Sequence, residues 1–251
     1  MRHEDSPDGT EPPVRGYAVT HPHGPVVLPT ADGWDQLIYA ASGVMTVRTG
    51  DGVWVVPPDR AVWVPSGVPH RIDMAGRTAI RTLYFRAGVA PMPPHTRAVN
   101  VSPLLRELIL HALRESPLAW DRHRHLVAVL LDQVRASDTA PLRLPLPDDP
   151  RARRCAEALL ADPADRSGVG ALARQVGAGR RTLERLFLAQ TGLTVGRWRE
   201  RARLLHALRL LAEGEPVTRV AHAVGYATPS AFGAMFAREL GTSPGRYVRR
   251  P

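Results

Sequence analysis

Hydrophobic and polar residues follow two different patterns along this 251-residue chain. Between residues 26 and 85, short apolar runs alternate with turn residues at intervals of about 8 to 12 positions, which is typical of an antiparallel barrel or sandwich. Beyond residue 102, apolar residues recur at the three- and four-residue spacing of amphipathic helices. The pattern predicts a β domain followed by a largely helical region.

The β region is predicted to contain five strands. Gly50, Asp51 and Gly52 fall between two β-branched runs, and these residue types tolerate the positive φ of a hairpin turn. Pro57 ends the strand that follows. The expected strands cover residues 36–41, 44–49, 53–56, 61–64 and 79–85.

Two helices are expected after the strands. Ser102 and Pro103 form an N-cap followed by a first-turn proline, and a second helix begins at about Ala119. The apolar stripes of these helices must be buried, either on the barrel or against a second copy of the chain. A homodimer is the preferred interpretation.

The expected domain organisation follows from these patterns. Residues at the N-terminus are rich in Pro, Gly, His and acidic side chains and lack periodicity, which predicts a mobile arm. A segment with four prolines before residue 151 predicts a linker. The expected parts are the arm 1–25, a β-barrel domain 26–100, a helical packing or dimerisation segment 101–136, the linker 137–150 and a helical domain 151–251.

Charge is distributed unevenly between these parts. Residues 1–150 contain 15 Arg against 16 Asp and Glu, a net charge of −1, whereas residues 151–251 contain 18 Arg against 8, a net charge of +10. The chain has no lysine, so every fixed cation is a guanidinium that can bind phosphate or guanine through two hydrogen bonds. The basic region therefore predicts a polyanionic partner.

Other features narrow the class of protein. A single cysteine, Cys155, excludes an intramolecular disulfide and suits a reducing compartment. No apolar run approaches the ~20 residues of a membrane span, and the N-terminus lacks the pattern of an export signal. We expect a cytoplasmic protein with no membrane partner and no cofactor.

The basic region contains a weak internal repeat. In each unit an alanine lies four residues before a glycine, at Ala173 and Gly177 and again at Ala221 and Gly225. Two closely crossing helices need a small side chain at their contact, and the turn between them needs a residue that tolerates positive φ. The repeat predicts two helix-turn-helix units. Their further paired core positions are Leu172 with Val220, Val176 with Val224, Leu183 with Phe232, and Phe187 with Phe236.

The repeat also predicts where the helices begin. The second helix of the first unit follows Gly179, and that of the second unit has Thr228 as N-cap and Pro229 as its first residue. Between the units, residues 194–211 form one helix, which at ~1.5 Å per residue spans roughly 27 Å. This length is close to the ~34 Å between successive major grooves on one face of DNA.

These residues resemble the AraC/XylS family of transcription regulators. The resemblance covers residues 151–250 and rests on three motifs: Arg-Thr-Leu-Glu-Arg-Leu-Phe at 181–187, Val-Gly-Tyr at 224–226 and Gly-Thr-Ser-Pro-Gly-Arg-Tyr at 241–247. It implies sequence-specific binding to double-stranded promoter DNA, with RNA polymerase as a further partner of an activator.

The resemblance also implies that the front of each second helix contacts bases. Arginine can bind a guanine edge through two hydrogen bonds, and glutamate can accept one from cytosine. The second unit departs from the family pattern at Gly233 and Ala234, so we expect it to contribute mainly backbone contacts and shape recognition. The expected DNA-binding residues are Arg180, Arg181, Glu184, Arg185, Thr228, Pro229, Ser230 and Ala234.

The β domain resembles a cupin sensor through Trp-Asp-Gln-Leu-Ile-Tyr at 34–39 and Pro-Ser-Gly-Val-Pro-His at 65–70. Thr30, Asp32 and Gln36 stand where metal-binding cupins carry two histidines and a glutamate, so only His70 of the ligand set remains and no metal is expected. A small-molecule effector inside the barrel is expected instead. The alternative is a filled barrel in which His70 is structural. The expected ligand-binding residues are Trp34, Gln36, Tyr39 and His70.

The sequence therefore predicts an α+β two-domain protein, with an N-terminal antiparallel, cupin-like β-barrel flanked by helices and a C-terminal all-α double helix-turn-helix. The expected function is transcription regulation without catalysis, modulated by a small molecule. Two alternatives stay open: a metal-dependent cupin enzyme with a DNA-binding appendage, and a non-specific architectural DNA-binding protein.

Overall fold

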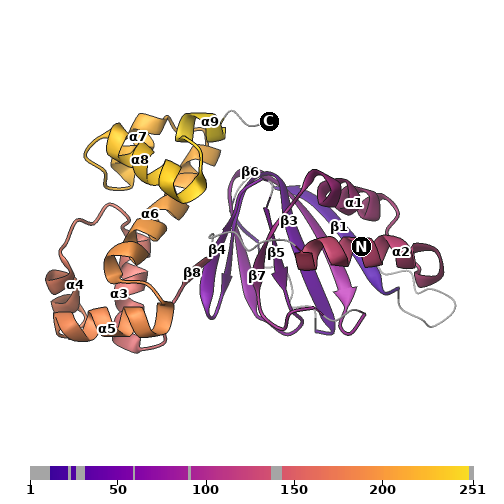
Figure 1. Cartoon of the computed structure of the whole chain (residues 1–251), viewed down its shortest axis with the longest axis horizontal. Helices are drawn as coiled ribbons and strands as arrows, with labels where there is room; N and C mark the ends of the chain where they lie inside the picture. Colours follow the sequence, from indigo (N-terminus) through magenta and orange to yellow (C-terminus); the bar gives the residue numbers. More distant parts are fainter. Residues whose placement is uncertain are drawn as a thin grey trace.

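The computed structural model describes residues 12–21, 24–26, 32–58, 60–89, 92–136 and 143–248. A β domain and a helical domain lie side by side in it (Figure 1). The strands are β1 (Val14–His21), β2 (Gly24–Val26), β3 (Trp34–Thr49), β4 (Gly52–Val56), β5 (Arg60–Val64), β6 (His70–Arg86), β7 (Arg97–Asn100) and β8 (Arg143–Pro145). The helices are α1 (Pro103–Arg114), α2 (Trp120–Ala136), α3 (Pro150–Ala161), α4 (Val169–Gln175), α5 (Arg180–Thr191), α6 (Val195–Ala212), α7 (Val217–Ala223), α8 (Pro229–Leu240) and α9 (Pro244–Val248).

Two long antiparallel strands, β3 and β6, form the frame of the β domain. Their pairing shifts register on both sides of Ser42, and the chain bends there. Gly43 has φ +74°, and a side chain on it would lie 2.6 Å from the carbonyl oxygen of Arg77, so only glycine fits this corner. One half of the pair is extended by β1, β5 and β7, and the other half by β2, β4 and β8. The bend thus folds one antiparallel sheet over a common interior.

The pairing corrects several of the expected strands. The two strands expected over 36–41 and 44–49 are one strand, because the bulge at Ser42 bends the chain without ending the ladder. β6 begins at His70 rather than near Ala79, since polar side chains alternate with Ile72 and Met74 in its first half and hide the apolar pattern. Four further strands, β1, β2, β7 and β8, were not predicted from the sequence.

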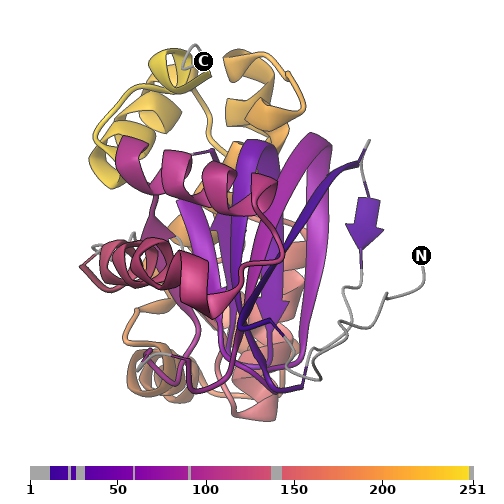
Figure 2. The same ribbon diagram turned by 90° about the vertical axis from the view of Figure 1, so that its right-hand side faces the viewer.

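The two faces of the bent sheet bury different clusters. Inside the barrel lie apolar side chains such as Ile38, Met45 and Trp54. On the opposite face of β3 and β5, Tyr39 and Trp63 pack under α1 and α2, which lie across the strands (Figure 2). The helix residues in this second cluster are Leu105, Ile109, Ala112, Val127, Leu130, Leu131 and Val134.

The apolar stripes of α1 and α2 are therefore buried on the barrel of their own chain. The preference for burying them against a second copy was wrong, because Trp63 and Phe85 already provide a large apolar surface on the β domain. Ser102 is the N-cap of α1 as predicted, and its hydroxyl accepts a hydrogen bond of 3.1 Å from the backbone N–H of Leu105.

The N-terminal segment is not a mobile arm throughout. Residues 14–21 form β1, which pairs with β6 along its whole length. Val14 is the one residue of β1 that is fully buried. Without alternating buried residues the sequence gives no strand pattern there. The strand is held mainly by its backbone pairing with β6. Gly16 donates a further hydrogen bond of 2.7 Å to Ser116 Oγ. Gly24 and Pro25, also in the expected arm, begin β2. Residues 1–11, 22 and 23 lie outside the described residues.

The segment expected to be a linker is also ordered in its described part. β8 pairs with β4, and Leu144 is completely buried. Proline prevents helix formation but is compatible with a short edge strand, and this is why a proline-rich segment forms β8. Residues 137–142 of the expected linker lie outside the described residues.

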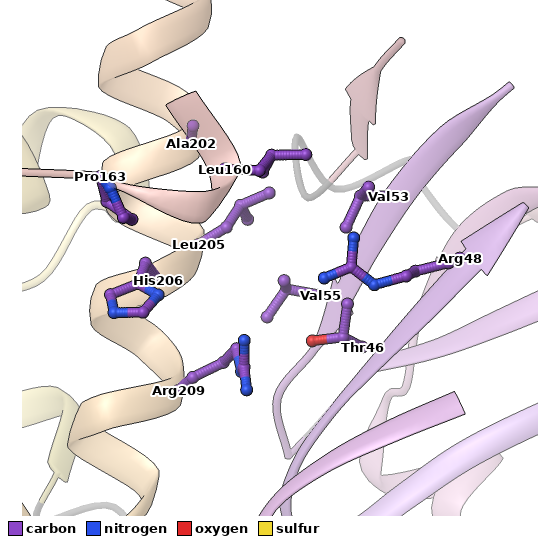
Figure 3. Close-up of a pocket in the computed structure, with 10 residues that line it drawn as sticks. All are labelled: Thr46, Arg48, Val53, Val55, Leu160, Pro163, Ala202, Leu205, His206 and Arg209. Carbon is purple, nitrogen blue, oxygen red and sulfur yellow. The ribbon is translucent and has the colours of Figure 1, made fainter. Parts of the chain in front are cut away.

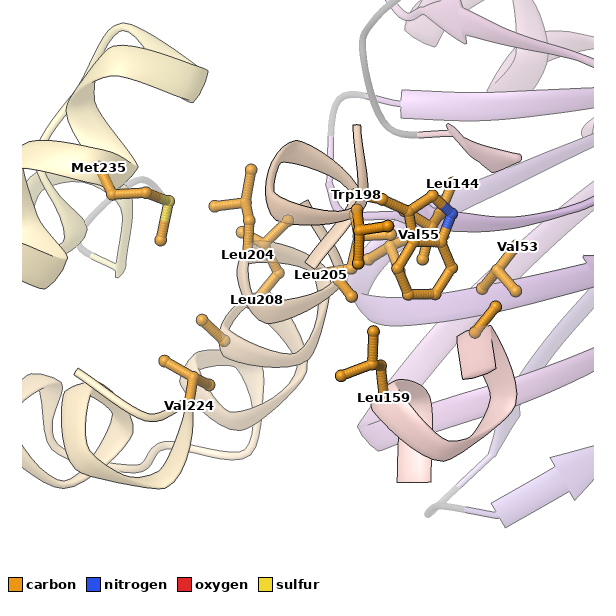
Figure 4. Close-up of a cluster of buried hydrophobic side chains, with 14 of the residues drawn as sticks. Val53, Val55, Leu144, Leu159, Trp198, Leu204, Leu205, Leu208, Val224 and Met235 are labelled. Atoms are coloured by element: carbon orange, nitrogen blue, oxygen red, sulfur yellow. The ribbon is translucent and has the colours of Figure 1, made fainter. Parts of the chain in front are cut away.

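The helix α6 belongs to the helical domain and packs against the β domain. It matches the helix predicted over 194–211, and the Thr194 hydroxyl caps it by accepting a hydrogen bond of 3.3 Å from the backbone N–H of Arg197. Trp198 and Leu205 point toward the sheet, whereas Leu204 and Leu208 point toward the helices of the C-terminal end (Figure 4). One continuous core joins the β4 side of the barrel, α6 and the C-terminal helices.

Specific hydrogen bonds reinforce this shared core. The Trp198 indole N–H donates to the carbonyl oxygen of Pro145 at 2.7 Å. The side-chain oxygen of Gln190, near the end of α5, accepts hydrogen bonds of 3.0 Å from the backbone N–H groups of Asp148 and Asp149. We call residues 143–149 the strap, because they tie α5 and α6 to the β domain.

No helix among the described residues is both long enough and apolar enough to cross a membrane.

Replacing Leu144 by alanine tests whether the strap is part of the core. We expect Leu144→Ala to lower the free energy of unfolding by about 2–5 kcal/mol, the usual cost of truncating a buried leucine. The matched control is Leu104→Ala, because Leu104 is 53% exposed and its truncation should change stability by less than about 0.5 kcal/mol. Urea denaturation measures both, and equal losses would contradict an ordered strap.

Candidate DNA-binding interface

The first helix-turn-helix unit is formed by α4 and α5. Gly177 adopts φ +68° in the turn between them, and the backbone N–H of Ala178 donates to the carbonyl oxygen of Ala173 at 2.9 Å. Ala173 is buried where the helices meet. The small residue and the left-handed glycine thus have the roles that their spacing predicted.

The second unit, formed by α7 and α8, reproduces this turn. Gly225 has φ +83°, and the backbone N–H of Tyr226 donates to the carbonyl oxygen of Ala221 at 2.9 Å. Both second helices end at a left-handed glycine, Gly192 with φ +70° and Gly241 with φ +69°. The sequence repeat is therefore a structural repeat, and the prediction of two helix-turn-helix units is confirmed.

Each second helix is oriented by two large apolar residues on its inner face. Leu183 and Phe187 of α5 and Phe232 and Phe236 of α8 are completely buried, as predicted for core positions. Phe187 contacts Trp198 edge-on with ring centroids 5.6 Å apart. Because these residues fix the inner face, the opposite face of each helix is turned to solvent.

The solvent face of α5 is cationic. Arg180, Arg181 and Arg185 are exposed near its N-terminal end. Arg180 Nε lies 3.1 Å from the Glu184 carboxylate, a pairing across one helical turn that holds this carboxylate on the exposed side. The predicted base-contacting residues of the first unit are therefore together on one accessible face.

One residue of this face was missed by the sequence analysis. Leu188 is 56% exposed and lies three residues after Arg185 and seven after Arg181, so it continues the same stripe. An exposed leucine on a charged helix face is suited to contact with the methyl group of thymine. The spacing of Leu188 from Arg181 and Arg185 along the helix was the sequence signal that could have placed it on this face.

The solvent face of α8 has a different chemistry. Thr228, Pro229, Ser230 and Ala234 are exposed, and the Thr228 hydroxyl accepts a capping hydrogen bond of 3.2 Å from the backbone N–H of Ala231. None of these four side chains is charged. Such a face allows close approach of the backbone but offers few hydrogen bonds to base edges.

Arginines of α6 mainly hold the protein together. Arg197 lies 2.9 Å from the Glu200 carboxylate, which also pairs with Arg238 of α8 at 3.2 Å. Arg199 donates to the carbonyl oxygen of Ser167 at 2.6 Å. Arg203 donates to the carbonyl oxygens of Pro163 and Asp165 at 2.9 and 2.7 Å, and burial lowers its pKa. These arginines therefore do not all face DNA, since several of their guanidinium groups bind carboxylates or backbone carbonyl groups of the protein itself.

The barrel interior brings together two of the four expected ligand-binding residues. Gln36 lies near the start of β3 and pairs with Val64, the last residue of β5, whereas His70 lies opposite Thr49 at the end of β3. Both side chains are buried. The His70 Nδ1 atom lies 2.9 Å from the carbonyl oxygen of Val68. Gln36 Oε1, His70 Nε2 and Thr82 Oγ1 are buried and have no hydrogen-bond partner among the described residues.

The other two expected residues are placed differently. Tyr39 is on the outer face of the sheet under α1 and α2, because it lies an odd number of positions from Gln36 along β3. Its assignment to the barrel interior was wrong. Trp34 is half-buried at the start of β3, with the Arg15 guanidinium 4.9 Å from its ring centroid.

The described residues offer no metal site. No group of three His, Cys, Asp or Glu side chains among them is placed to hold a metal ion. Asp32 is exposed at the start of the described range 32–58, and Thr30 lies outside the described residues. A lone imidazole beside a neutral amide is a poor set of ligands for a divalent ion.

Comparison with known proteins finds similarity over both halves of the chain. Residues 18–115 match a family model described as an AraC-like ligand binding domain, and residues 172–250 match one described as a helix-turn-helix domain. The HTH-type transcriptional regulator NimR of Escherichia coli is 34% identical over 217 residues, covering 86% of this chain and 80% of NimR. A putative AraC-like transcription regulator of Streptomyces antibioticus is 32% identical, covering 88% of this chain and 72% of its own.

Solved structures also show similarity. The DNA-binding domain of AdpA, in complex with a target DNA, is 31% identical and covers 39% of this chain and 89% of its own, with a TM-score of 0.38. ToxT from Vibrio cholerae with a bound unsaturated fatty acid is 11% identical and covers 94% of each chain, with a TM-score of 0.41.

The two turn glycines provide a matched test of the repeat. A Cβ on Gly225 would lie 2.8 Å from Arg203 Nη2 and 3.0 Å from the carbonyl oxygen of Ala164, whereas a Cβ on Gly177 would meet nothing within 4 Å. We expect Gly177→Ala to lower the free energy of unfolding by about 1–2 kcal/mol from left-handed strain alone.

Gly225→Ala should lower it further, by about 1–3 kcal/mol, because the clash adds to the strain. Both losses are measured by urea denaturation. Equal losses would show that the second turn is not packed as described.

Proposed function

Because the chain belongs to the AraC-like family of helix-turn-helix transcriptional regulators, we propose that it binds promoter DNA through the exposed faces of α5 and α8. Its N-terminal part is an AraC-like ligand-binding domain and its C-terminal part a DNA-binding domain. The β domain formed by β1 to β8 is proposed as the sensor, rather than residues 26–100 alone, because β1 and β8 belong to the same sheet. Residues 151–251 are proposed as the DNA-binding domain, and α1 and α2 pack on the sensor.

The observation that supports this proposal best is the pair of helix-turn-helix units on one helix. The helix α6 lies between α5, the last helix of the first unit, and α7, the first helix of the second unit. At ~1.5 Å per residue its 18 residues span roughly 27 Å. Two recognition helices at such a spacing suit successive major grooves on one face of B-DNA, which are ~34 Å apart. A binding site with two elements about ten base pairs apart is the consequence.

The two units are proposed to recognise DNA in different ways. Arg181 and Arg185 are suited to guanine edges, and Glu184, positioned by Arg180, to the amino group of cytosine. Leu188 adds an apolar contact on the same face. The uncharged front of α8, from Thr228 to Ala234, favours phosphate contacts and shape recognition over direct base recognition.

The effector is proposed to bind in the mouth of the barrel. Gln36, His70 and Thr82 each have a buried polar side-chain atom without a partner among the described residues, and they lie on the face of the sheet that forms the barrel interior. Leaving such atoms unpaired is costly, so a polar ligand that pairs with them gains binding energy there. The filled barrel is the alternative, with His70 fixed by Val68.

A catalytic role is not part of the proposal. A cupin enzyme with a DNA-binding appendage requires a resident metal, and the barrel residues Asp32, Gln36 and His70 do not form a suitable ligand set. The architectural alternative requires only positive charge, whereas the cationic face of α5 combines arginines with an ion-paired glutamate and a leucine. That mixture suits discrimination between bases.

The remaining partners follow from this role. We place the protein in the cytoplasm, where promoter DNA is accessible, and RNA polymerase is a further partner if the protein is an activator. A homodimer is proposed through the outer faces of α1 and α2. These faces are free of the barrel and expose Leu104 and Val129.

Replacing Arg185 tests base recognition directly. We expect Arg185→Ala to weaken binding to the preferred DNA site by about 1–3 kcal/mol and to abolish discrimination at one base position, because a bidentate contact is lost. Binding is measured by fluorescence anisotropy at one fixed salt concentration, on duplexes carrying each of the four bases at every position. The control is Arg106→Ala, an exposed arginine on α1. Uniform weakening on all duplexes would favour the architectural alternative.

Charged substitutions test the dimer. Leu104→Glu combined with Val129→Glu should shift the protein from dimer to monomer in sedimentation velocity experiments, since a charge at an apolar contact must be desolvated. The control pair is Arg106→Glu with Asp132→Lys, at exposed positions that are already polar. A wild-type protein that sediments as a monomer at micromolar concentration would refute this interface.

A further inference from the structure

A pocket lies between the two domains, outside the barrel. Its walls are the outer face of β3 and β4 on one side and α3 and α6 on the other (Figure 3). About 350 Å³ of space there is not filled by protein atoms, and part of it is open to solvent. Thr46 and Val55 face it from the sheet, and Leu205, His206 and Arg209 face it from α6.

The pocket is separate from the barrel interior. Met45 and Val47 of β3 point into the barrel, so the alternating residues Thr46 and Arg48 point out of it toward α6. A ligand bound here would contact both domains at once, whereas a ligand near Gln36 would contact the sensor alone.

Two polar atoms of the pocket lack partners. Thr46 is 2% exposed, and its hydroxyl oxygen has no hydrogen-bond partner within the described parts of the chain. The same is true of Arg209 Nε, which is also buried. Figure 3 shows the Thr46 oxygen directed toward the side of the pocket where His206 and Arg209 lie. Native proteins seldom leave such atoms unpaired, so a partner is expected.

The charge of the pocket is positive and only partly compensated. Its lining contains Arg48 and Arg209 but no Asp or Glu. Arg48 is paired outside the lining with Asp73, at 3.0 Å, whereas no ion pair to Arg209 is found among the residues that the structure describes. Burial, followed by the charge of Arg209, lowers the pKa of His206, so its imidazole is neutral at pH 7. Arg209 is the uncompensated cation.

The rest of the lining is apolar. Val53 and Val55 of β4 and Leu160, Ala202 and Leu205 of the helices form a hydrophobic floor beside the polar groups. A phosphate dianion would leave this floor without a contact, and a neutral hydrocarbon would leave Arg209 and Thr46 unpaired. The ligand that satisfies both parts has one compact negative charge and a small apolar body.

We propose that this pocket binds a small organic monocarboxylate, whose carboxylate is held by the Arg209 guanidinium and the Thr46 hydroxyl while its apolar body lies on Val55 and Leu205. Guanidinium and carboxylate match in geometry and charge, and the threonine hydroxyl supplies a further donor. Such a ligand stabilises the arrangement in which α6 rests on the sheet. It thereby gives the protein a second point of control, at the helix that spaces the two DNA-binding units.

Ligand titration of the full-length protein, without DNA, tests the site independently of the proposed function. The probes are acetate, butyrate, hexanoate and 4-fluorobenzoate, with 4-fluorobenzamide and inorganic phosphate as neutral and dianionic comparisons, followed by calorimetry and by ¹⁹F NMR for the fluorinated pair. We expect saturable binding of at least one carboxylate larger than acetate, and at least tenfold weaker binding of the amide. Absence of saturable carboxylate binding, or tighter binding of phosphate, would overturn the proposal.

Four variants locate the bound carboxylate. Arg209→Gln should weaken binding at least tenfold and Thr46→Val several-fold, and the latter is nearly isosteric, so the fold is retained. Arg106→Gln, at a distant exposed arginine, is the control and should bind the carboxylate like wild type. Gln36→Leu, in the proposed effector site of the barrel, distinguishes the two sites. Unchanged binding in Arg209→Gln, or a loss confined to Gln36→Leu, would place the ligand elsewhere and contradict the assignment.

Discussion

The packing of α6 on three neighbours is the constraint on which the rest of the structure depends. The buried side chains of α6 contact the sheet and both helix-turn-helix units. Trp198 and Leu205 face the sheet, and Trp198 also contacts Phe187 of α5 in the first unit. Leu208 faces the helices of the second unit. The sheet, α6 and both units thus share one continuous buried core.

The strap makes this connection closer than a flexible linker would. Leu144 inserts into the shared core, Trp198 donates to the strap backbone, and Gln190 of α5 binds its last residues. The sensor is thus fixed to the helix proposed to recognise bases. The second unit has no comparable strap and is held to α6 by core packing and by the Arg197–Glu200–Arg238 ion pairs. These pairs are half exposed and contribute little on their own.

The sequence predicted the helical half well, because each of its signals is local. Caps, left-handed glycines and the alanine at each helix crossing are set by neighbours within a few residues, and Thr228, Gly177 and Ala173 all behave as expected. The faces of α5 and α8 followed from helical periodicity. The charge count, by contrast, overstated the cations available to DNA, since arginines such as Arg199 and Arg203 bind backbone carbonyl groups.

The β half was harder because its determinants are distant in sequence. β1 has few buried side chains and exists through its pairing with β6 more than fifty residues later in the chain. The apolar stripes of α1 and α2 pack on the outer face of the sheet that carries Trp63. The residue pattern within each helix does not reveal that this face is available, so it could not decide between the barrel and a second chain. Tyr39 was predicted to face the barrel interior, but it lies on the outer face of the sheet. Side chains alternate between faces along a strand, so its odd spacing from Gln36 already indicated opposite faces.

The most direct test of the central claim, that α6 spaces two different DNA-reading helices, is selection of bound sequences from a random duplex library at one near-physiological salt concentration. Salt must be fixed because affinity for DNA falls steeply as it rises. The account predicts a motif with two elements about ten base pairs apart, strongly specified where α5 binds and weakly specified where α8 binds. Tight binding without any enriched motif, or a motif with a single element, would contradict it.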